Sequence, residues 1–420
     1  MTSRLVAVLV TLTVVLTATA TAGAQTSATT TRPSAATTTT RAAPQRRTAT
    51  EGVTATSITV GGLGDSLLYG GADIGAKARF QRANDAGGVN GRTIEYLGLT
   101  DDGGDATLDA QAATTLAQQE GVFAVVPAVA PDLAGAPVLV RQKVPYFGWA
   151  LSSNFCGNDY GFGFTGCLLP ARTASNAWGV LVAQQLTTAS VGKTAAILTE
   201  DTPSGKYQLA ALTAGVKSAK LRVVYGKSSL TVPAPTDYTA IVQQVMASNG
   251  AKLPDSIFVV GSISSVAGVQ QAVRAAGYLE VFTNQLQYAP NLVAPAIGAF
   301  VMIGTAATET VSTNPAMRQL ITDVHKIAPD QPIDQSVIAG YFSADMFLAA
   351  VKNAGKQLTV GRLLAAANHN FTYSVAHTVG PTKFPAAHTQ PTPCGSLVFT
   401  NGTSYSVKVP YTCGKVVAVK

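Results

Sequence analysis

Few residues of this 420-residue chain have the types and spacing that chemistry requires. Ser66 follows an apolar run, and a serine nucleophile would need a neighbouring base. Two pairs of adjacent acids, Asp101-Asp102 and Glu200-Asp201, also follow apolar runs. Adjacent carboxylates at a strand end point apart, so these pairs do not favour acid–base or metal chemistry. We interpret Asp101 and Asp102 as structural and Asp201 as facing a ligand.

The block around Ser66, Gly64-Asp65-Ser66-Leu67, resembles the signature of the Gly-Asp-Ser-Leu esterase and lipase family. Gly157-Asn158-Asp159 resembles a later block of that family, with one residue missing. The family supplies the base as Asp-x-x-His near the C-terminus. Here the residues that stand three positions before the four histidines are Thr322, Ala366, Ser374 and Pro385. Since none is an acid, a secreted serine esterase using Ser66 is kept only as the enzyme alternative.

The first fifty residues differ in composition from the rest. Residues 1–24 are typical of a secretory signal, with Arg4, an apolar run and a small-residue cleavage site. No cysteine lies near that site, so we expect a secreted or envelope protein that is not a lipoprotein. Residues 25–56, mostly Thr, Ala, Ser, Arg, Pro and Gln, predict a disordered linker.

The charge of the chain is concentrated in the same N-terminal stretch. Residues 1–50 hold five arginines and no acid, so the net charge of +7 falls to 7 − 5 = +2 for the remainder. Clustered basic residues are absent from that remainder, and nucleic acid is not an expected partner. The four histidines and four cysteines lack CxxC and HExxH spacing, so we expect no metal site and no cofactor.

The four cysteines are instead expected to form disulfides, as is usual in an exported chain. Cys156 and Cys167 bracket ten residues rich in Gly, Asn and aromatic side chains, which favours a closed loop over free thiols. Cys394 and Cys413 flank an Asn-Gly hairpin signal at 397–407 and should pair across its base.

From residue 57 the chain alternates apolar runs with helical segments. Predicted strands near 58–63, 94–100, 122–126 and 144–147 are separated by helices, the first of which spans Gly71 to Asp85. This alternation predicts a doubly wound parallel sheet, in which ligands bind at loops that leave the carboxyl ends of the strands. The loops at Ser66, Ala130 and Trp149 should therefore meet in one cleft.

The segment from Asn84 to Arg92 reads Asn-Asp-Ala-Gly-Gly-Val-Asn-Gly-Arg. With the elements that follow it, this segment resembles the branched-chain amino acid binding proteins, type I periplasmic binding proteins that serve ABC importers. The resemblance covers about residues 57–410. It implies two doubly wound α/β lobes joined by a three-strand hinge, with lobe one at 57–170 and 301–388 and lobe two at 171–300 and 389–420.

Other predicted elements follow from the same comparison. Lobe two is expected to begin with a helix from Thr173 to Leu186. The apolar strand from Ala299 to Gly304 is expected to return the chain to lobe one, as it does in the family.

The resemblance also implies which loops bind the ligand. In lobe one the expected residues are Ser66, Tyr69, Ala130, Trp149, Ala150 and Ser152. In lobe two they are Asp201, Ser262, Gln285 and Gln287. Ser66 at a helix N-terminus suits a carboxylate, although it could instead merely cap the helix. Trp149 follows Gly148 in a loop, which favours exposure in the cleft over a place in the core.

Several of these positions depart from the family pattern. Ala130 and Ala150 stand where hydroxyls are common, and Gln285 and Gln287 stand about where amino acid binders carry an acid. A neutral amide, a polyol or an aromatic acid stacked on Trp149 fits at least as well as an amino acid. We expect a monomeric, non-enzymatic receptor that clamps a small ligand for an ABC permease. A ligand sensor without a transporter is the nearest variant.

Overall fold

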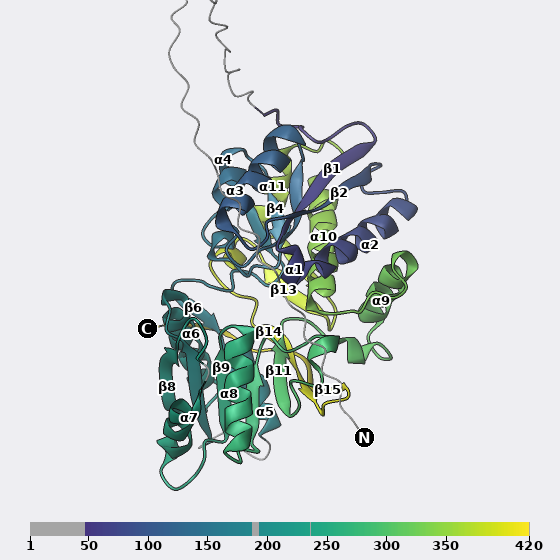
Figure 1. Ribbon diagram of the computed structural model, residues 1–420. Helices are drawn as coiled ribbons and strands as arrows, with labels where there is room; N and C mark the ends of the chain where they lie inside the picture. The colour runs from purple at the N-terminus through teal and green to yellow at the C-terminus, as the bar shows by residue number, and fades with distance from the viewer. Residues whose placement is uncertain (1–46, 187–192, 236, 420) are drawn as a thin grey trace, which may run out of the picture. The chain divides into compact units, whose positions relative to one another are not determined.

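Two mainly parallel sheets organise the part of the chain that the computed structural model describes, residues 47–186, 193–235 and 237–419 (Figure 1). The predicted signal and the linker up to residue 46 lie outside these residues. No helix in the described ranges has the length and apolar content to cross a membrane. The predicted class, α/β with two parallel-sheet lobes, is confirmed.

The lobe-one sheet has the order β2-β1-β3-β4-β5, and every neighbouring pair is parallel. Its strands are β1 (Ser57–Gly64), β2 (Thr93–Asp101), β3 (Ala124–Val129), β4 (Tyr146–Gly148) and β5 (Gly161–Gly163). β3 is buried along its whole length because helices cover both faces of the sheet. Its side chains alternate between two apolar clusters, Ala124 and Val126 in one and Val125 in the other.

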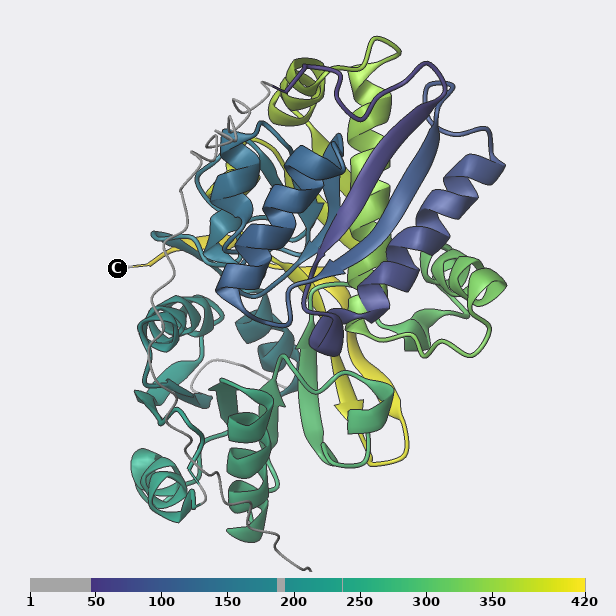
Figure 2. The same cartoon turned by 45° about the horizontal axis from the view of Figure 1, so that its top comes forward.

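The first of these clusters contains α2, α9, α10 and α11, and the second contains α3 and α4. The bounds are α2 (Gly71–Asp85), α3 (Ala106–Thr114), α4 (Ala136–Arg141), α9 (Pro315–Ile327), α10 (Gln335–Ala354) and α11 (Val360–Asn368), with a π-helical turn at Thr115–Gln119 after α3. Figure 2 shows α2 and α10 side by side. A Cβ on Gly75 would lie 2.0 Å from the Val337 carbonyl oxygen, so only glycine permits this approach.

The lobe-two sheet has the order β15-β14-β11-β10-β9-β7-β8. Its parallel strands are β7 (Thr194–Glu200), β8 (Arg222–Leu230), β9 (Ser256–Val260), β10 (Val281–Asn284) and β11 (Ala299–Ile303). The antiparallel strands β14 (Cys394–Thr400) and β15 (Tyr405–Cys413) complete it. The helices of this lobe are α5 (Ala177–Gln185), α6 (Pro203–Ser218), α7 (Thr239–Met246) and α8 (Ile263–Ala275).

Two predicted boundaries in this region were wrong. β11 pairs with β10 and β14, so the chain leaves lobe two after Ile303 and not at residue 301. The predicted helix from Thr173 begins only at Ala177, because Thr173–Ser175 form a strand, β6, that pairs with β16 (Val416–Ala418). This pairing joins segments more than two hundred residues apart, and local sequence does not encode it.

The predicted linker also ends earlier than residue 56. The guanidinium group of Arg47 donates to the carbonyl oxygens of Ala117 at 2.6 Å and Val122 at 2.5 Å. The N–H of Val360 donates to the Ala49 carbonyl oxygen at 2.9 Å. Residues 47–56 are therefore ordered against lobe one, since their backbone and one arginine find partners there.

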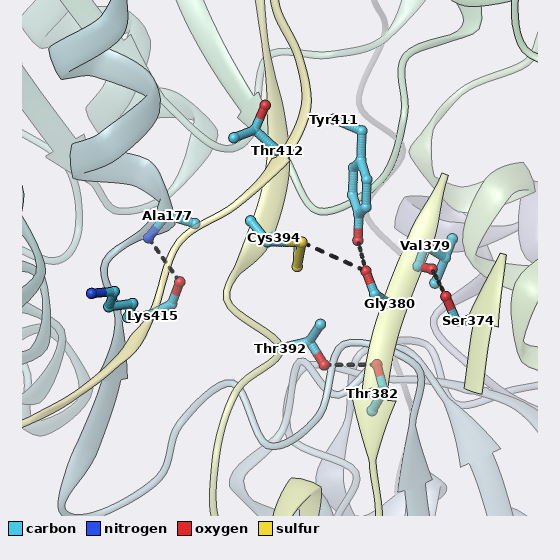
Figure 3. The surroundings of a disulfide bond; sticks show 12 residues. Ala177, Ser374, Val379, Gly380, Thr382, Thr392, Cys394, Tyr411, Thr412 and Lys415 are labelled. Atoms are coloured by element: carbon cyan, nitrogen blue, oxygen red, sulfur yellow. Dashed lines mark hydrogen bonds between the residues drawn. A yellow bond between two sulfur atoms is a disulfide. The ribbon is translucent and has the colours of Figure 1, made fainter. Parts of the chain in front are cut away.

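Both predicted disulfides are present, Cys156–Cys167 and Cys394–Cys413. The second joins directly paired residues of β14 and β15. Around it, the Tyr411 hydroxyl donates to the Gly380 carbonyl oxygen at 3.0 Å, and Thr382 and Thr392 share a hydrogen bond of 2.7 Å (Figure 3). These contacts attach the hairpin of β12 (Thr372–Val375) and β13 (Val379–Lys383) to the crossover that enters β14.

Candidate ligand-binding site

Loops of lobe one converge where the parallel strands end. Gly64 at the end of β1 pairs with Val129 at the end of β3, and Ala128 of β3 pairs with Gly148 at the end of β4. The segments that begin at Ser66, Ala130 and Trp149 consequently leave the same edge of the sheet, as the sequence predicts.

Ser66 begins the short helix α1 (Ser66–Tyr69) and its side chain is exposed. It does not cap the helix. Asp65 Oδ1 does so by accepting the N–H groups of Leu67 at 2.9 Å and Leu68 at 3.2 Å. The N–H of Ser66 donates to Asp101 Oδ1 at 2.9 Å, and this bond, with one from Gly103, holds the pKa of the Asp101 carboxyl below its ordinary value. Carboxylates of the protein thus occupy the N–H groups that we expected to hold a ligand carboxylate.

Trp149 and Tyr69 form the aromatic part of this edge. Their rings meet edge to face, with centroids 6.2 Å apart and planes at 84°. Both side chains are half-buried, so neither is a fully enclosed core residue. Burial, reinforced by the charge of Asp65, raises the pKa of the Tyr69 hydroxyl, which therefore stays a neutral hydrogen-bond donor.

A small cavity of about 10 Å³ lies beside Trp149. Its lining residues come from lobe one and from the chain directly after β5 and β11, where the chain crosses between the lobes: Trp149, Phe164, Thr165, Gly304, Thr305, Gln335, Ile338 and Ala339. The Thr165 side chain is buried, and its Oγ1 has no hydrogen-bond partner within the described residues. Sequence reasoning missed Thr165, although its place in a disulfide-closed loop at the first crossover was a usable signal.

Three further residues predicted in lobe one do not present polar groups to this edge. Ala130 and Ala150 are buried in the apolar cluster that contains α3 and α4. Ser152 is also buried; its hydroxyl donates to the Asp132 carbonyl oxygen at 2.5 Å and accepts the N–H of Asn154 at 3.1 Å. These three side chains stabilise the loops of lobe one, because they pack in its apolar cluster or form hydrogen bonds within the loop.

In lobe two, Asp201, Ser262 and Gln285 are exposed after β7, β9 and β10, where the strands of this sheet end. Asp201 forms an exposed ion pair with Lys206 at 2.8 Å. Ser262 caps α8 by accepting the N–H of Ser265 at 3.3 Å.

The other predicted glutamine, Gln287, is buried, and its Oε1 accepts a hydrogen bond from the Asn284 side chain at 2.7 Å. This bond closes the loop after β10, so Gln287 Oε1, which we expected to face a ligand, is engaged within its own loop.

Glu200, at the end of β7, connects two loops of lobe two and was not singled out from the sequence as a site residue. Its Oε1 accepts the N–H of Ser262 at 2.8 Å and the hydroxyl of Ser265 at 2.9 Å. This carboxylate holds the start of α8 against the end of β7.

A buried carboxyl group supports the loop after β3. Asp109 in the first turn of α3 accepts the N–H of Gly135 at 2.5 Å. Burial raises the pKa of Asp109 to about 7, and a hydrogen bond with Asp102 adds to the effect. Asp102 is itself buried and accepts the N–H of Gly104 at 2.8 Å, in keeping with a structural role.

The serine esterase alternative requires a base beside Ser66. In the described ranges, which include all four histidines, no histidine is hydrogen-bonded to Ser66. The ring of His388 is buried and its Nε2 bonds Asn368 at 2.5 Å, while His325 bonds the Gln331 carbonyl oxygen at 3.1 Å. Within the same ranges there is also no group of three or more His, Cys, Asp or Glu side chains that could hold a metal ion.

Two α/β lobes with ligand loops at the ends of parallel strands define a type I binding-protein fold. The sequence pattern of the periplasmic binding protein family matches residues 57–403, and the chain belongs to this family. No curated protein matches the chain.

Solved structures share this fold at low sequence identity. A fatty acid ABC transporter substrate-binding protein from Thermomonospora curvata has a TM-score of 0.66 at 19% identity, covering 88% of this chain and 95% of that one. The branched-chain amino acid transporter substrate binding protein LivJ from Streptococcus pneumoniae, in complex with isoleucine, has a TM-score of 0.62 at 18% identity. The match covers 85% of this chain and 100% of that one. A solute binding protein from R. palustris in complex with benzoate has a TM-score of 0.60 at 16% identity. The match covers 86% of this chain and 98% of that one.

Proposed function

We propose that this protein is an extracytoplasmic solute-binding protein that holds a small organic molecule between its two lobes and catalyses no reaction. The observation that carries the proposal is the two-lobe fold, in which the loops after parallel strands converge beside the half-buried Trp149 and a small cavity lined by Thr165. An aromatic surface with a few convergent polar groups is typical of small-molecule sites. Ser66, Tyr69, Asp201, Ser262 and Gln285 are the other side chains that we assign to its rim.

Delivery to an ABC permease is the second part of the proposal. The named relatives that bind fatty acid, isoleucine or benzoate serve transporters of this kind, which supports the same partner here. The predicted signal sequence at 1–24 supports export, and because no cysteine lies near residue 24 we propose a secreted or envelope protein that is not a lipoprotein. We propose a monomer, because one chain supplies both lobes.

The test is a thermal-shift screen of the full mature chain against amino acids, amides, alcohols, sugars and aromatic acids. A ligand present at a hundred times its Kd should raise the free energy of unfolding by about 2.7 kcal/mol. Small-angle scattering of the saturated protein should then show a smaller radius of gyration than that of the free protein, because binding closes a hinge. A liganded protein as expanded as the free one would contradict the clamp.

Transport is tested separately in cells of the source organism. Deletion of the gene should abolish uptake of the ligand found in the screen, and a plasmid copy of the natural gene should restore it. Normal uptake in the deletion strain, with binding intact, would instead favour a ligand sensor. Ester hydrolysis that disappears in Ser66→Ala would favour the esterase alternative.

A further inference from the structure

Most polar groups assigned to the ligand are already used within the protein. The N–H groups at the start of α1 donate to Asp65 and Asp101, and the hydroxyl of Ser152 serves its own loop. In lobe two, Asp201 is paired with Lys206. A zwitterionic ligand needs donors or cations for its carboxylate and acceptors or anions for its ammonium group. At this edge most such groups already have partners within the protein.

The cavity beside Trp149 is uncharged. None of the eight described residues that line it is an acid or a base, and its polar side chains are those of Thr165, Thr305 and Gln335. The Thr305 hydroxyl donates to the Ala306 carbonyl oxygen at 3.1 Å, which leaves Thr165 and Gln335 to meet a ligand. A volume of about 10 Å³ accommodates roughly one water-sized group.

Charge near the cavity disfavours an anion. Asp334 precedes Gln335 and caps α10, accepting the N–H of Val337 at 2.9 Å. Asp65 follows β1 and Asp101 ends β2, and both carboxylates hold the start of α1. A ligand carboxylate buried here would have acids near it and no cation among the lining residues, and an unpaired buried charge costs far more than a neutral hydrogen bond contributes.

Two exposed apolar side chains precede Tyr69 at this edge of lobe one. Leu67 is 91% exposed and Leu68 is 53% exposed on α1, directly before Tyr69, whose ring contacts Trp149. Each leucine exposes apolar surface at the edge where ligand loops converge. Two successive exposed leucines beside a half-buried aromatic pair indicate a binding region more strongly than a single exposed leucine does.

We propose that the ligand is an uncharged molecule with one hydrogen-bonding head, an amide or alcohol, on an aromatic or acyl body. The head bonds the Thr165 hydroxyl and the Gln335 amide, and the body lies on Trp149, Tyr69 and the two leucines. This assignment rests on the proposed function and names its substrate class. It also replaces our sequence-based expectation of a mainly polar ligand.

The test uses probes that share one carbon skeleton. These are 3-phenylpropanamide, 3-phenylpropanol, 3-phenylpropanoate, 3-phenylpropylamine and phenylalanine, titrated into the full mature chain. Trp178, the second tryptophan, is buried and donates to Thr283 Oγ1 at 2.9 Å. In a Trp178→Phe background, fluorescence therefore reports on Trp149 alone. The amide and the alcohol should change this emission saturably, with dissociation constants at least tenfold lower than those of the other three probes.

Two pairs of variants locate the head and the body. Thr165→Val removes an unpartnered hydroxyl at constant shape and should weaken amide binding about threefold to tenfold without lowering stability, whereas Thr165→Ser should restore the affinity. Leu67→Ser should weaken binding by a similar factor. Leu279, 84% exposed at the opposite, amino end of β10, is its matched control, and Leu279→Ser should leave binding unchanged.

Each result decides the inference. Tightest binding of the carboxylate, the amine or phenylalanine, equal affinity in Thr165→Val, or no response from any of the five probes would overturn it. The proposed function is judged by the separate screen, where a charged ligand that closes the lobes would preserve the receptor and refute only the neutral class. If no compound in that screen binds, both the receptor function and the neutral ligand class would be contradicted.

Discussion

Arg79 on α2 and Asp345 on α10 form an ion pair, with 2.6 Å between Arg79 Nε and Asp345 Oδ1. The other oxygen of Asp345 accepts the hydroxyl of Tyr373 at 2.9 Å. Asp345 thereby joins both helices to the β12–β13 hairpin, which precedes the last crossover. Three segments distant in sequence depend on this one carboxylate.

Replacing Asp345 should therefore destabilise lobe one. Asp345→Ala leaves a mostly buried guanidinium group and a buried hydroxyl without their acceptor, and we expect a loss of about 2–4 kcal/mol. Urea unfolding measures it. Lys326→Ala, which breaks an exposed pair with Asp85, is the control and should change stability much less. Equal losses in the two variants would mean that burial does not strengthen the Asp345 contacts.

Asp109 should make stability depend on pH. Its folded-state pKa is raised to about 7, above the ordinary value of 3.8, so folding binds a proton between about pH 4 and pH 7. Stability should fall across that interval as pH rises. Asp109→Asn keeps the acceptor for Gly135 and removes the charge, so its stability relative to the natural chain should increase from pH 4.5 to pH 8 in urea titrations. A pH-independent difference would contradict the raised pKa.

Two helical glycines should respond oppositely to alanine. A Cβ on Gly340 would lie 2.0 Å from the Ala72 carbonyl oxygen, so Gly340→Ala should separate α2 from α10 and cost about 1–3 kcal/mol or more. Gly361 in α11 has its nearest such neighbour at 4.0 Å. Gly361→Ala should stabilise the protein by roughly 0.5–1 kcal/mol through helix propensity. Thermal unfolding of both variants measures whether each substitution raises or lowers stability. Stabilisation by Gly340→Ala would contradict the close approach of α2 and α10.

Arg47 should secure the ordered end of the linker. Arg47→Ala removes two hydrogen bonds to the carbonyl oxygens of Ala117 and Val122, and we expect a loss of about 1–2 kcal/mol in urea unfolding. A lysine lacks the forked donors of the guanidinium group, so Arg47→Lys should recover only part of the loss. Protease cleavage between residues 47 and 56 should become faster in Arg47→Ala; an unchanged rate would indicate that other contacts hold this segment.

Local sequence was sufficient for much of the fold. The bounds of α2 agree with the helix predicted from Gly71 to Asp85, and both disulfides follow from the placement of four cysteines. The convergence of the loops at Ser66 and Trp149 follows from strand order, since parallel strands bring their carboxyl ends to one edge.

The errors share a physical cause, which is competition for a side chain or a backbone group by distant parts of the chain. Thr173–Ser175 form a strand because β16 supplies a partner, and residues 47–56 are ordered because lobe one supplies acceptors. Ser152 and Gln287 have the chemistry of ligand-binding residues, but their own loops use it. Whether a polar side chain bonds its own loop or stays free for a ligand depends on the folded conformation of that loop.

By itself, the sequence determined the α/β class, the family pattern, the cysteine pairs and the loops that form the candidate site, because these depend on periodicity and order along the chain. Tertiary structure decided which groups in those loops remain available to a ligand. It buried Ser152 and Gln287 with their partners satisfied and brought Thr165, without a partner in the described residues, to the cavity beside Trp149. Availability depends on packing, and packing brings together residues that lie far apart in sequence.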